Sequence, residues 1–258
     1  LLLLLFAPWP ARSLGQQSLS ARFAPPPGAS RTDVIKGSFA HFLRHYPLLP
    51  PGTPVTLHTG ALKGRQDVHA AVLDLSVGRR DLQQCADATM RLRAEYHYAR
   101  GEHAAITFSF TNGFVAEWDR WRRGERVRVT GDRCTWYSGG PQDSSHAQLL
   151  KFMDLVFTYA GTRSLARDLV PCTTAPMPGD IFIKGGSPGH AVIVMDVARR
   201  ADGRTYLLLA QSYMPAQQMH VLRNHITPDL GPWFEWNVGA ALVTPEWTFA
   251  WGDRRCWP

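Results

Sequence analysis

Cys85 lies at the predicted start of a helix, where a thiol can become a nucleophile. Asp81 can act as the N-cap of this helix, and Gln84 completes a capping-box pattern ahead of an apolar-periodic run. At such a position the unpaired backbone N–H groups and the positive end of the helix dipole favour the thiolate and lower the pKa of a cysteine. The pattern therefore predicts a reactive thiol, although a single cysteine on an amphipathic helix is also typical of a small core residue.

His190 follows a glycine-rich turn further along the chain. Residues 178–194 have the pattern of a strand, a turn rich in glycine and a second strand that begins at His190. The neighbouring glycines leave the imidazole accessible, so it can take a proton from a thiol and later return it to a leaving group. We therefore predict His190 as the general base for Cys85.

Residues 205–213 form the next predicted strand and offer a side chain that can orient the imidazole. The turn between the two strands predicts an antiparallel hairpin, which brings Gln211 back beside His190. We predict Gln211 as the orienting residue, but the sequence does not fix the register, and a slip of one residue would place Ser212 on that face instead. Asp196 lies further up the same strand as His190, about 20 Å away at the usual strand rise, and is a poor orienter.

Further polar side chains lie next to these three residues in the sequence. The backbone N–H of the candidate nucleophile and the side chain of Gln84 can hold an oxyanion, although Gln84 can equally be only a helix cap. Lys184 and Ser187 border the histidine turn and can meet a carboxylate of a substrate. Ser212 and Tyr213 complete the candidate substrate or oxyanion residues.

The elements that must position these residues predict an α+β fold with an antiparallel sheet. Periodicity predicts helices and strands besides the hairpin, the helices at residues 38–46, 85–98 and 145–160 and the strands at 55–58, 68–77 and 104–110. We expect a single domain over residues 31–258, in which residues 114–176 form an insertion that can supply one wall of a substrate cleft. The tryptophan-rich residues 232–258 can line a groove, but core packing is the commoner role of such aromatics.

Composition and charge limit the classes of partner. The chain has 258 residues, of which 45% are hydrophobic, and this is enough for a substantial core. The net charge of +7 favours anionic partners. The charge is diffuse, however, with no lysine-rich run and no zinc-finger spacing, so we expect no nucleic-acid partner.

His41 and His45 have the i, i+4 spacing of a zinc-binding helix. The residues between them lack the glutamate of a zinc protease motif, so two surface histidines are the better interpretation. The sequence also has no P-loop and no dinucleotide-binding glycine pattern. We therefore predict no metal and no cofactor.

The first residues resemble the end of a secretory signal whose charged start is missing. Residues 1–5 are all leucine, and this apolar stretch is too short to span a membrane. The proline-rich residues 25–28 predict a linker. We therefore assign residues 1–30 to a truncated signal peptide and linker and expect a secreted or periplasmic protein without a transmembrane segment. The alternative is a low-complexity start from an incomplete gene prediction.

The four cysteines allow three complete disulfide pairings. If Cys85 is a free nucleophile, Cys134 and Cys172 flank much of the predicted insertion and can close it with a disulfide, which leaves Cys256 unpaired. A bridged Cys85 would instead end the catalytic hypothesis.

Three strings of the sequence resemble a family of secreted bacterial proteins of unknown function. They are LQQCADA around Cys85, GGSPGHAVIV around His190 and LAQSYMPAQ around Gln211, and the resemblance covers about residues 38–249. At a greater distance, Gln-Cys at a helix start and Gly-His at a strand start resemble the papain-like cell-wall amidases and endopeptidases of the NlpC and CHAP type.

The distant resemblance implies a papain-like fold in which Cys85 is the nucleophile, His190 the base and Gln211 the orienting residue. Two departures are the glutamine, where those families more often have His, Asn or Glu, and the long insertion between Cys85 and His190. The resemblance implies a cell-envelope cysteine amidase or peptidase with a peptide or peptidoglycan-type substrate. A papain-like protein that binds an envelope polymer without chemistry is the alternative hypothesis.

Overall fold

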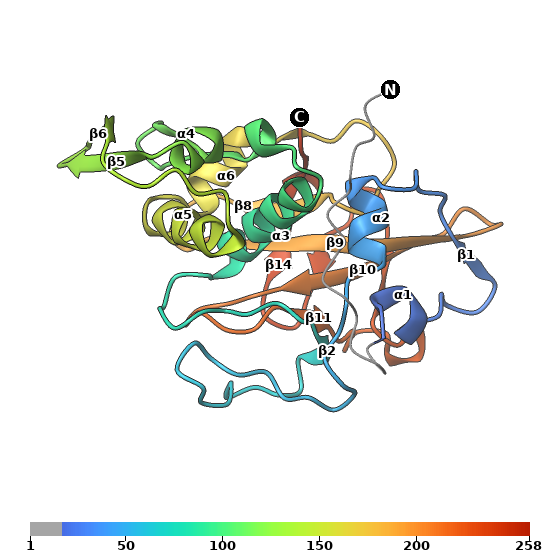
Figure 1. Cartoon of the computed structure of the whole chain (residues 1–258). Coiled ribbons are helices and arrows are strands. Elements are labelled where there is room, and N and C mark those ends of the chain that lie inside the picture. The colour runs from blue at the N-terminus through green and yellow to red at the C-terminus, as the bar shows by residue number, and fades with distance from the viewer. Residues whose placement is uncertain (1–16) are drawn as a thin grey trace, which may run out of the picture.

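A nine-stranded antiparallel sheet forms the centre of the protein (Figure 1). The computed structural model describes residues 17–258. The strands of the sheet are β1 (Ala29–Arg31), β2 (His69–Val72), β7 (Val170–Pro171), β8 (Ile181–Lys184), β9 (His190–Arg200), β10 (Thr205–Gln211), β11 (His220–Leu222), β12 (Trp233–Trp236) and β15 (Arg254–Cys256). The main path runs β2-β11-β10-β9-β8-β15-β7, while β1 pairs with β9 and β12 pairs with β10.

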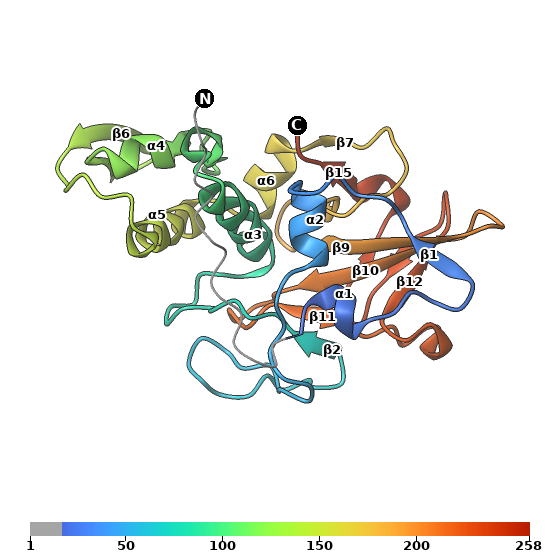
Figure 2. The same cartoon turned by 45° about the vertical axis from the view of Figure 1, so that its right-hand side comes forward.

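Helices and three short hairpins surround this sheet. The α-helices are α1 (Leu19–Arg22), α2 (Phe39–Arg44), α3 (Cys85–Ala99), α4 (Trp118–Arg122), α5 (His146–Tyr159) and α6 (Thr162–Asp168), and the 3-10 helices are η1 (His103–Ala105), η2 (Pro228–Leu230) and η3 (Trp251–Asp253). The hairpins pair β3 (Thr107–Ser109) with β4 (Val115–Glu117), β5 (Glu125–Thr130) with β6 (Arg133–Ser138), and β13 (Leu242–Val243) with β14 (Thr248–Phe249). In both views the segment from α4 to α5 lies at one end of the molecule (Figures 1 and 2).

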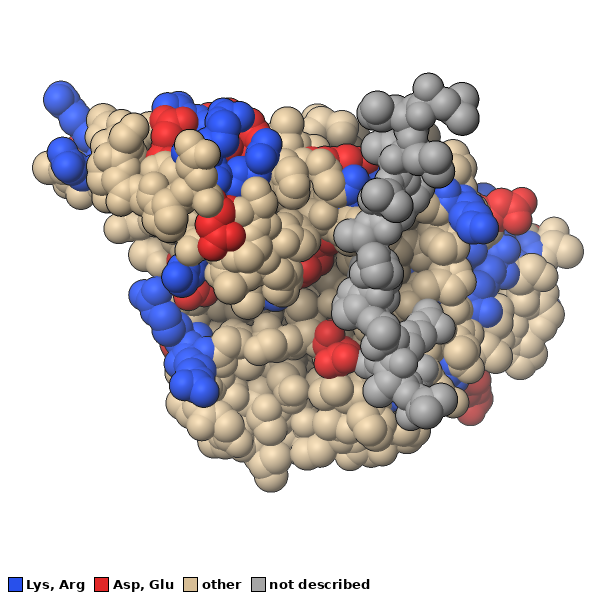
Figure 3. Space-filling view, in the orientation of Figure 1, with Lys and Arg blue, Asp and Glu red and all other residues tan. Residues whose placement is uncertain are grey.

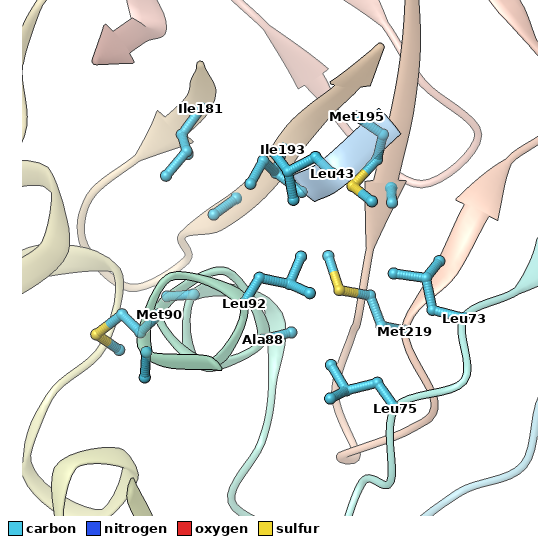
Figure 4. Close-up of a cluster of buried hydrophobic side chains, with 14 of the residues drawn as sticks. Leu43, Leu73, Leu75, Ala88, Met90, Leu92, Ile181, Ile193, Met195 and Met219 are labelled. Carbon is cyan, nitrogen blue, oxygen red and sulfur yellow. The ribbon is translucent and has the colours of Figure 1, made fainter. Parts of the chain in front are cut away.

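Both faces of the sheet are buried. On one face, Leu92 and Ala88 of α3 point towards Ile193 and Met219 of the sheet region (Figure 4). A second apolar cluster, which includes Phe182 of β8, covers the other face. Because neither face meets solvent, β9 and β10 are continuously buried strands rather than alternating ones, as their long apolar runs require.

A β-bulge determines which way the start of β9 faces. Met195 is the extra residue of β9 between the pairs Leu208–Asp196 and Leu209–Val194. Side chains alternate between the two faces of a strand, so one extra residue reverses the face of every position beyond it. The bulge therefore turns the first residue of β9 to the same face as the last residue of β10.

Asp196 lies at this bulge and is fully buried. Its Oδ1 accepts hydrogen bonds from Arg44 Nε (2.7 Å) and from the backbone N–H of Val197 (2.9 Å), and its Oδ2 accepts one from Arg31 Nε (2.6 Å). A buried carboxylate is stable only when it is paired and hydrogen-bonded. The arginines of α2 and β1 therefore stabilise the bulged conformation of β9.

The α+β class with a large antiparallel sheet is confirmed. The predicted helices correspond to α2, α3 and α5, and Ser38 and Ser145 are the N-caps of the first and the last. The predicted strand at 55–58 is wrong, because this segment forms only isolated bridges. The strand predicted at 68–77 shortens to β2, and the one predicted at 104–110 begins with η1 and continues as β3.

The folded region begins earlier than the predicted boundary at residue 31. Leu19 is fully buried in the core and β1 pairs with β9, so residues 19–30 are not a linker. Their proline-rich composition is typical of a linker, but here the prolines before β1 form a turn that leads into a strand. The predicted signal at residues 1–13 lies outside the described residues.

The disulfide joins Cys172 to Cys256, so the predicted pairing of Cys134 with Cys172 is wrong. Cys172 follows β7 and Cys256 ends β15, and pairing of these two strands brings the cysteines together. Cys134 lies instead on the outer β5–β6 hairpin and is free. Cys85 is also free, which excludes the bridged alternative.

Lys and Arg side chains lie at several places on the surface. In Figure 3, Lys and Arg side chains cluster at the upper left, over α4 and the β5–β6 hairpin. Several of them are paired: Arg122 and Arg123 contact Asp119, and Arg120 contacts Glu125. Among residues 17–258, no helix combines the length and the apolar character needed to cross a membrane.

Candidate active site

Cys85 is the first residue of α3, but the predicted cap of this helix is wrong. Gln84 rather than Asp81 is the N-cap, and its backbone N–H donates to Asp87 Oδ2 (3.1 Å). Asp81 instead accepts from the backbone N–H of Ala216 (2.6 Å) and from Gln84 Nε2 (3.1 Å). A tertiary contact with the loop after β10 thus replaces the local contact that the sequence pattern suggests.

Cys85 and His190 line one cavity of about 350 Å³. The helix start supplies one wall, and the turn before β9 and the loop after β10 supply others. Phe157 and Thr162, which lie in the segment predicted as an insertion, also line the cavity, as does Trp247. Residues far apart in the chain thus surround the thiol and the imidazole.

His190 is hydrogen-bonded to Gln211. The two residues lie on the same face of the sheet because of the bulge in β9, and His190 Nε2 is 2.8 Å from Gln211 Oε1. Both side chains are buried. Of the two registers open to the sequence, the structure has the one in which Gln211 meets the imidazole.

Aromatic rings enclose the imidazole. Its centroid lies 4.9 Å from that of Tyr213, 5.5 Å from that of Trp247 and 5.9 Å from that of Phe249. These contacts limit the motion of the ring and shield it from water. The tryptophan-rich tail thus serves both the core and the site, because Trp233 is buried in the core whereas Trp247 lines the cavity.

Two charged residues behind Gln211 were not predicted from the sequence. Gln211 Nε2 donates to Glu246 Oε2 (2.6 Å), and Glu246 Oε1 is paired with Lys63 Nζ (2.8 Å). The side chains of Lys63 and Glu246 are only 7% and 9% exposed. Each lies in an irregular segment with no local motif, so no pattern in the sequence singles them out.

Burial makes the neutral forms of the thiol and the imidazole the stable ones. Desolvation, with a smaller effect of Asp87, raises the pKa of Cys85 to about 11, while the backbone N–H of Ala191 acts in the opposite direction. Desolvation also lowers the pKa of His190 to about 4, although Gln211 acts to raise it. The pKa of Cys85 is therefore shifted in the direction opposite to that expected from the helix dipole alone.

Asp87 is a second buried acid at the start of α3. Desolvation raises its pKa to about 8, against the effect of its hydrogen bond with the backbone of Gln84. Its Oδ1 has no hydrogen-bond partner among the described residues. The start of the helix therefore adds no full negative charge beside Cys85 below neutral pH.

The remaining predicted site residues divide into two groups. Gln84, Ser187 and Tyr213 line the cavity. Ser212 does not, because it is fully buried and its hydroxyl oxygen lies within hydrogen-bond distance of the backbone carbonyls of Gln83 (3.1 Å) and Gln217 (2.8 Å). Lys184 is exposed and is not part of the cavity wall. Ser212 and Lys184 therefore lie outside the cavity wall, contrary to the prediction from the sequence.

One cluster of potential metal ligands occurs among the described residues. Cys172, Cys256 and Asp180 place a ligand atom each within 4.8 Å of one another. Both cysteines are joined in the disulfide, so neither offers a thiolate. This cluster supports the fold rather than a metal.

The fold and the site define a mixed α/β protein with a large antiparallel sheet, in which a free cysteine at a helix start and a histidine at a strand start share one cavity. The chain belongs to the family described as Domain of unknown function (4846), whose model matches residues 19–255. This agrees with the family of unknown function that the sequence strings resemble. No curated protein and no solved structure was found to match the chain.

Proposed function

We propose that the protein is a cysteine hydrolase that cleaves an amide bond in a peptide, with peptides of the peptidoglycan type as its substrate class. The observation that carries this proposal is the shared cavity of Cys85 and His190, together with the hydrogen bond from His190 to Gln211. A nucleophile, a base and a group that orients the base are the parts that acyl transfer needs. We also propose that the arrangement of these parts is papain-like.

The reaction begins from the neutral pair. Cys85 Sγ attacks the carbonyl carbon while its proton passes to the imidazole of His190, and backbone N–H groups at the start of α3 face the developing oxyanion. His190 then gives the proton to the leaving nitrogen, the C–N bond breaks and a thioester remains. Water attacks the thioester with His190 as base, which releases the carboxylic acid and restores the thiol.

The disulfide supports a place outside the cytoplasm. Disulfides such as Cys172–Cys256 persist in oxidising compartments and are rare in the cytosol. We therefore propose a secreted or periplasmic location, where peptides of the cell envelope are available as substrates.

A binding protein of the cell envelope without catalytic activity is the second candidate. The raised pKa of Cys85 and the lowered pKa of His190 favour it, because they disfavour a preformed thiolate–imidazolium pair. In the described part of the chain, no hydrogen bond joins the Cys85 thiol to the imidazole. Catalytic contacts of this kind often tighten only when substrate binds.

The test is hydrolysis of purified muropeptides, followed by mass spectrometry of the products. We expect the wild-type protein to release a new amine and a new carboxylate, and Cys85→Ala and His190→Ala to abolish release. Cys134→Ala, which changes the other free cysteine, is the matched control and should remain active. Binding of muropeptides without cleavage by the wild-type protein would establish the second candidate instead.

A further inference from the structure

A buried chain of polar contacts runs from the imidazole to a lysine. It passes from His190 Nε2 to Gln211 Oε1 (2.8 Å), from Gln211 Nε2 to Glu246 Oε2 (2.6 Å) and from Glu246 Oε1 to Lys63 Nζ (2.8 Å). Buried polar groups are costly unless satisfied, so each link limits the orientation of the next.

The carboxylate fixes the orientation of the glutamine. An ionised carboxylate only accepts hydrogen bonds, whereas an amide offers a donor at one end and an acceptor at the other. Glu246 therefore requires the NH₂ group of Gln211, and the amide must turn its oxygen towards His190. A reversed amide would place two acceptors against each other.

The glutamine in turn fixes the proton on the imidazole. Gln211 Oε1 can only accept, so Nε2 of His190 must carry the hydrogen. A neutral imidazole has one N–H, which leaves Nδ1 unprotonated and able to act as a base. The charge on Glu246 thus determines which ring nitrogen can receive the proton of Cys85.

Lys63 keeps this charge in place. A buried carboxylate is costly unless it is paired and hydrogen-bonded. The ammonium group of Lys63 supplies this partner through its ion pair with Glu246, and it also lies 5.2 Å from the centre of the Tyr213 ring.

We propose that Glu246, paired with Lys63, is a positioning residue that holds His190 in the Nε2–H tautomer through Gln211. The inference rests on the proposed function for its meaning in catalysis. The tautomer itself can be measured whether or not the protein hydrolyses amides.

The test is nuclear magnetic resonance of the full chain labelled with ¹⁵N-histidine. Long-range couplings between ring protons and nitrogens distinguish the two tautomers, and His190→Ala assigns the signal. We expect Nε2–H in the wild-type protein near neutral pH. We expect a mixture of tautomers in Glu246→Gln, because the new amide can either donate to Gln211 or accept from it, whereas Glu235→Gln on β12 is the matched control and should leave the signal unchanged.

Modification of Cys85 supplies a second readout. A histidine with a protonated Nδ1 cannot take the proton of the thiol, so we expect alkylation of Cys85 at neutral pH to slow in Glu246→Gln in proportion to the fraction of His190 in the Nδ1–H tautomer. If that variant does not fold, a double variant, Lys63→Met with Glu246→Leu, removes both charges together, which is often tolerated in a buried pair.

The outcomes separate the positioning role from the proposed function. An Nδ1–H tautomer in the wild-type protein, or an unchanged tautomer in the folded variants, would overturn the role of Glu246. A tautomer that responds to Glu246→Gln in a protein that cleaves no muropeptide would support the positioning role and refute the hydrolase.

Discussion

At the residue scale, burial outweighs the helix dipole at Cys85. The dipole and the free N–H groups at the start of α3 stabilise a thiolate, but loss of hydration at this half-buried position destabilises it more, and the net effect is a raised pKa. The imidazole of His190 responds to the same burial with a lowered pKa. In the proposed reaction, the thiolate of Cys85 would therefore form as the substrate is attacked, when the proton has a base nearby.

Alkylation of Cys85 by iodoacetamide should follow the raised pKa. Because the thiolate fraction increases about tenfold per pH unit below the pKa, the rate should rise steadily from pH 7 to pH 10 in the absence of substrate. The rate is measured by mass spectrometry of the Cys85 peptide, with Cys134 in the same protein as the internal control. A rate that is already constant between pH 5 and pH 8 would show a preformed ion pair.

At the element scale, the bulge in β9 brings the imidazole and its partner together. In an unbroken strand, His190 would face the opposite side of the sheet from Gln211, since the side-chain period is two. Asp196, which is too far away to orient His190, contributes in another way: with Arg31 and Arg44 it stabilises the bulge.

Asp196→Asn should destabilise the fold and disturb the site together. Loss of the charge leaves two arginines without their buried partner, and breaking such a pair typically costs about 3–5 kcal/mol of unfolding free energy. Urea denaturation measures the loss, and the His190 ring signal reports its contact with Gln211. Asp202→Asn, in the exposed turn after β9, is the control and should have little effect on the unfolding free energy or on the His190 ring signal. An unchanged ring signal in a destabilised Asp196→Asn protein would show that the contacts of Asp196 at the bulge do not determine the contact between His190 and Gln211.

Local patterns in the sequence predicted the elements of the site but not the tertiary contacts. The start of α3 and the turns around β9 have characteristic capping and glycine patterns, so Cys85, His190 and Gln211 could be selected from the sequence. The bulge has no such pattern, and the strand alternation was uninformative because both faces of β9 are buried. Glu246 and Lys63 lie in irregular segments, and only the folded chain brings them to Gln211.

At the scale of the whole molecule, several buried groups have pKa values far from their usual range. Desolvation lowers the pKa of His190 to about 4 and that of His220 to about 3, and it raises that of Asp87 to about 8. The histidines stabilise the fold above their unfolded pKa of 6.5 and lose this contribution as the pH falls. Asp87 acts in the opposite direction, because its contribution is full below 3.8 and is lost as the pH rises through about 8.

The unfolding free energy should therefore fall as the pH decreases from 6.5 to about 4. In this window the unfolded state protonates the histidines whose pKa values burial lowers in the folded state, and these outnumber the buried aspartates that act in the opposite direction, so the unfolded state binds more protons. Denaturant titrations at several pH values measure the slope. His220→Asn should flatten it, whereas His225→Asn, at an exposed position, should not. Stability that is constant or increases over this range would contradict the assigned directions.

Loss of the Cys172–Cys256 disulfide should destabilise the whole fold. The cysteines are 84 residues apart, and the chain-entropy model gives a loss of about 4–5 kcal/mol for a loop of this length. A Cys172→Ser, Cys256→Ser double variant, compared with the oxidised wild-type protein in urea, measures the change. Cys134→Ser is the control for removal of a cysteine, and equal midpoints for all three proteins would refute a stabilising role.

The pairing of Lys63 with Glu246 has a consequence for the order in which the chain is made. These residues are 183 positions apart, and Cys85 lies between them. Chains are synthesised from the N-terminus, and their domains fold as units. Cys85 is therefore synthesised long before Glu246, the residue proposed to position His190. An emerging chain carries an unassembled site until its last segments are in place. Such timing would keep the proposed site inert while the chain is still incomplete.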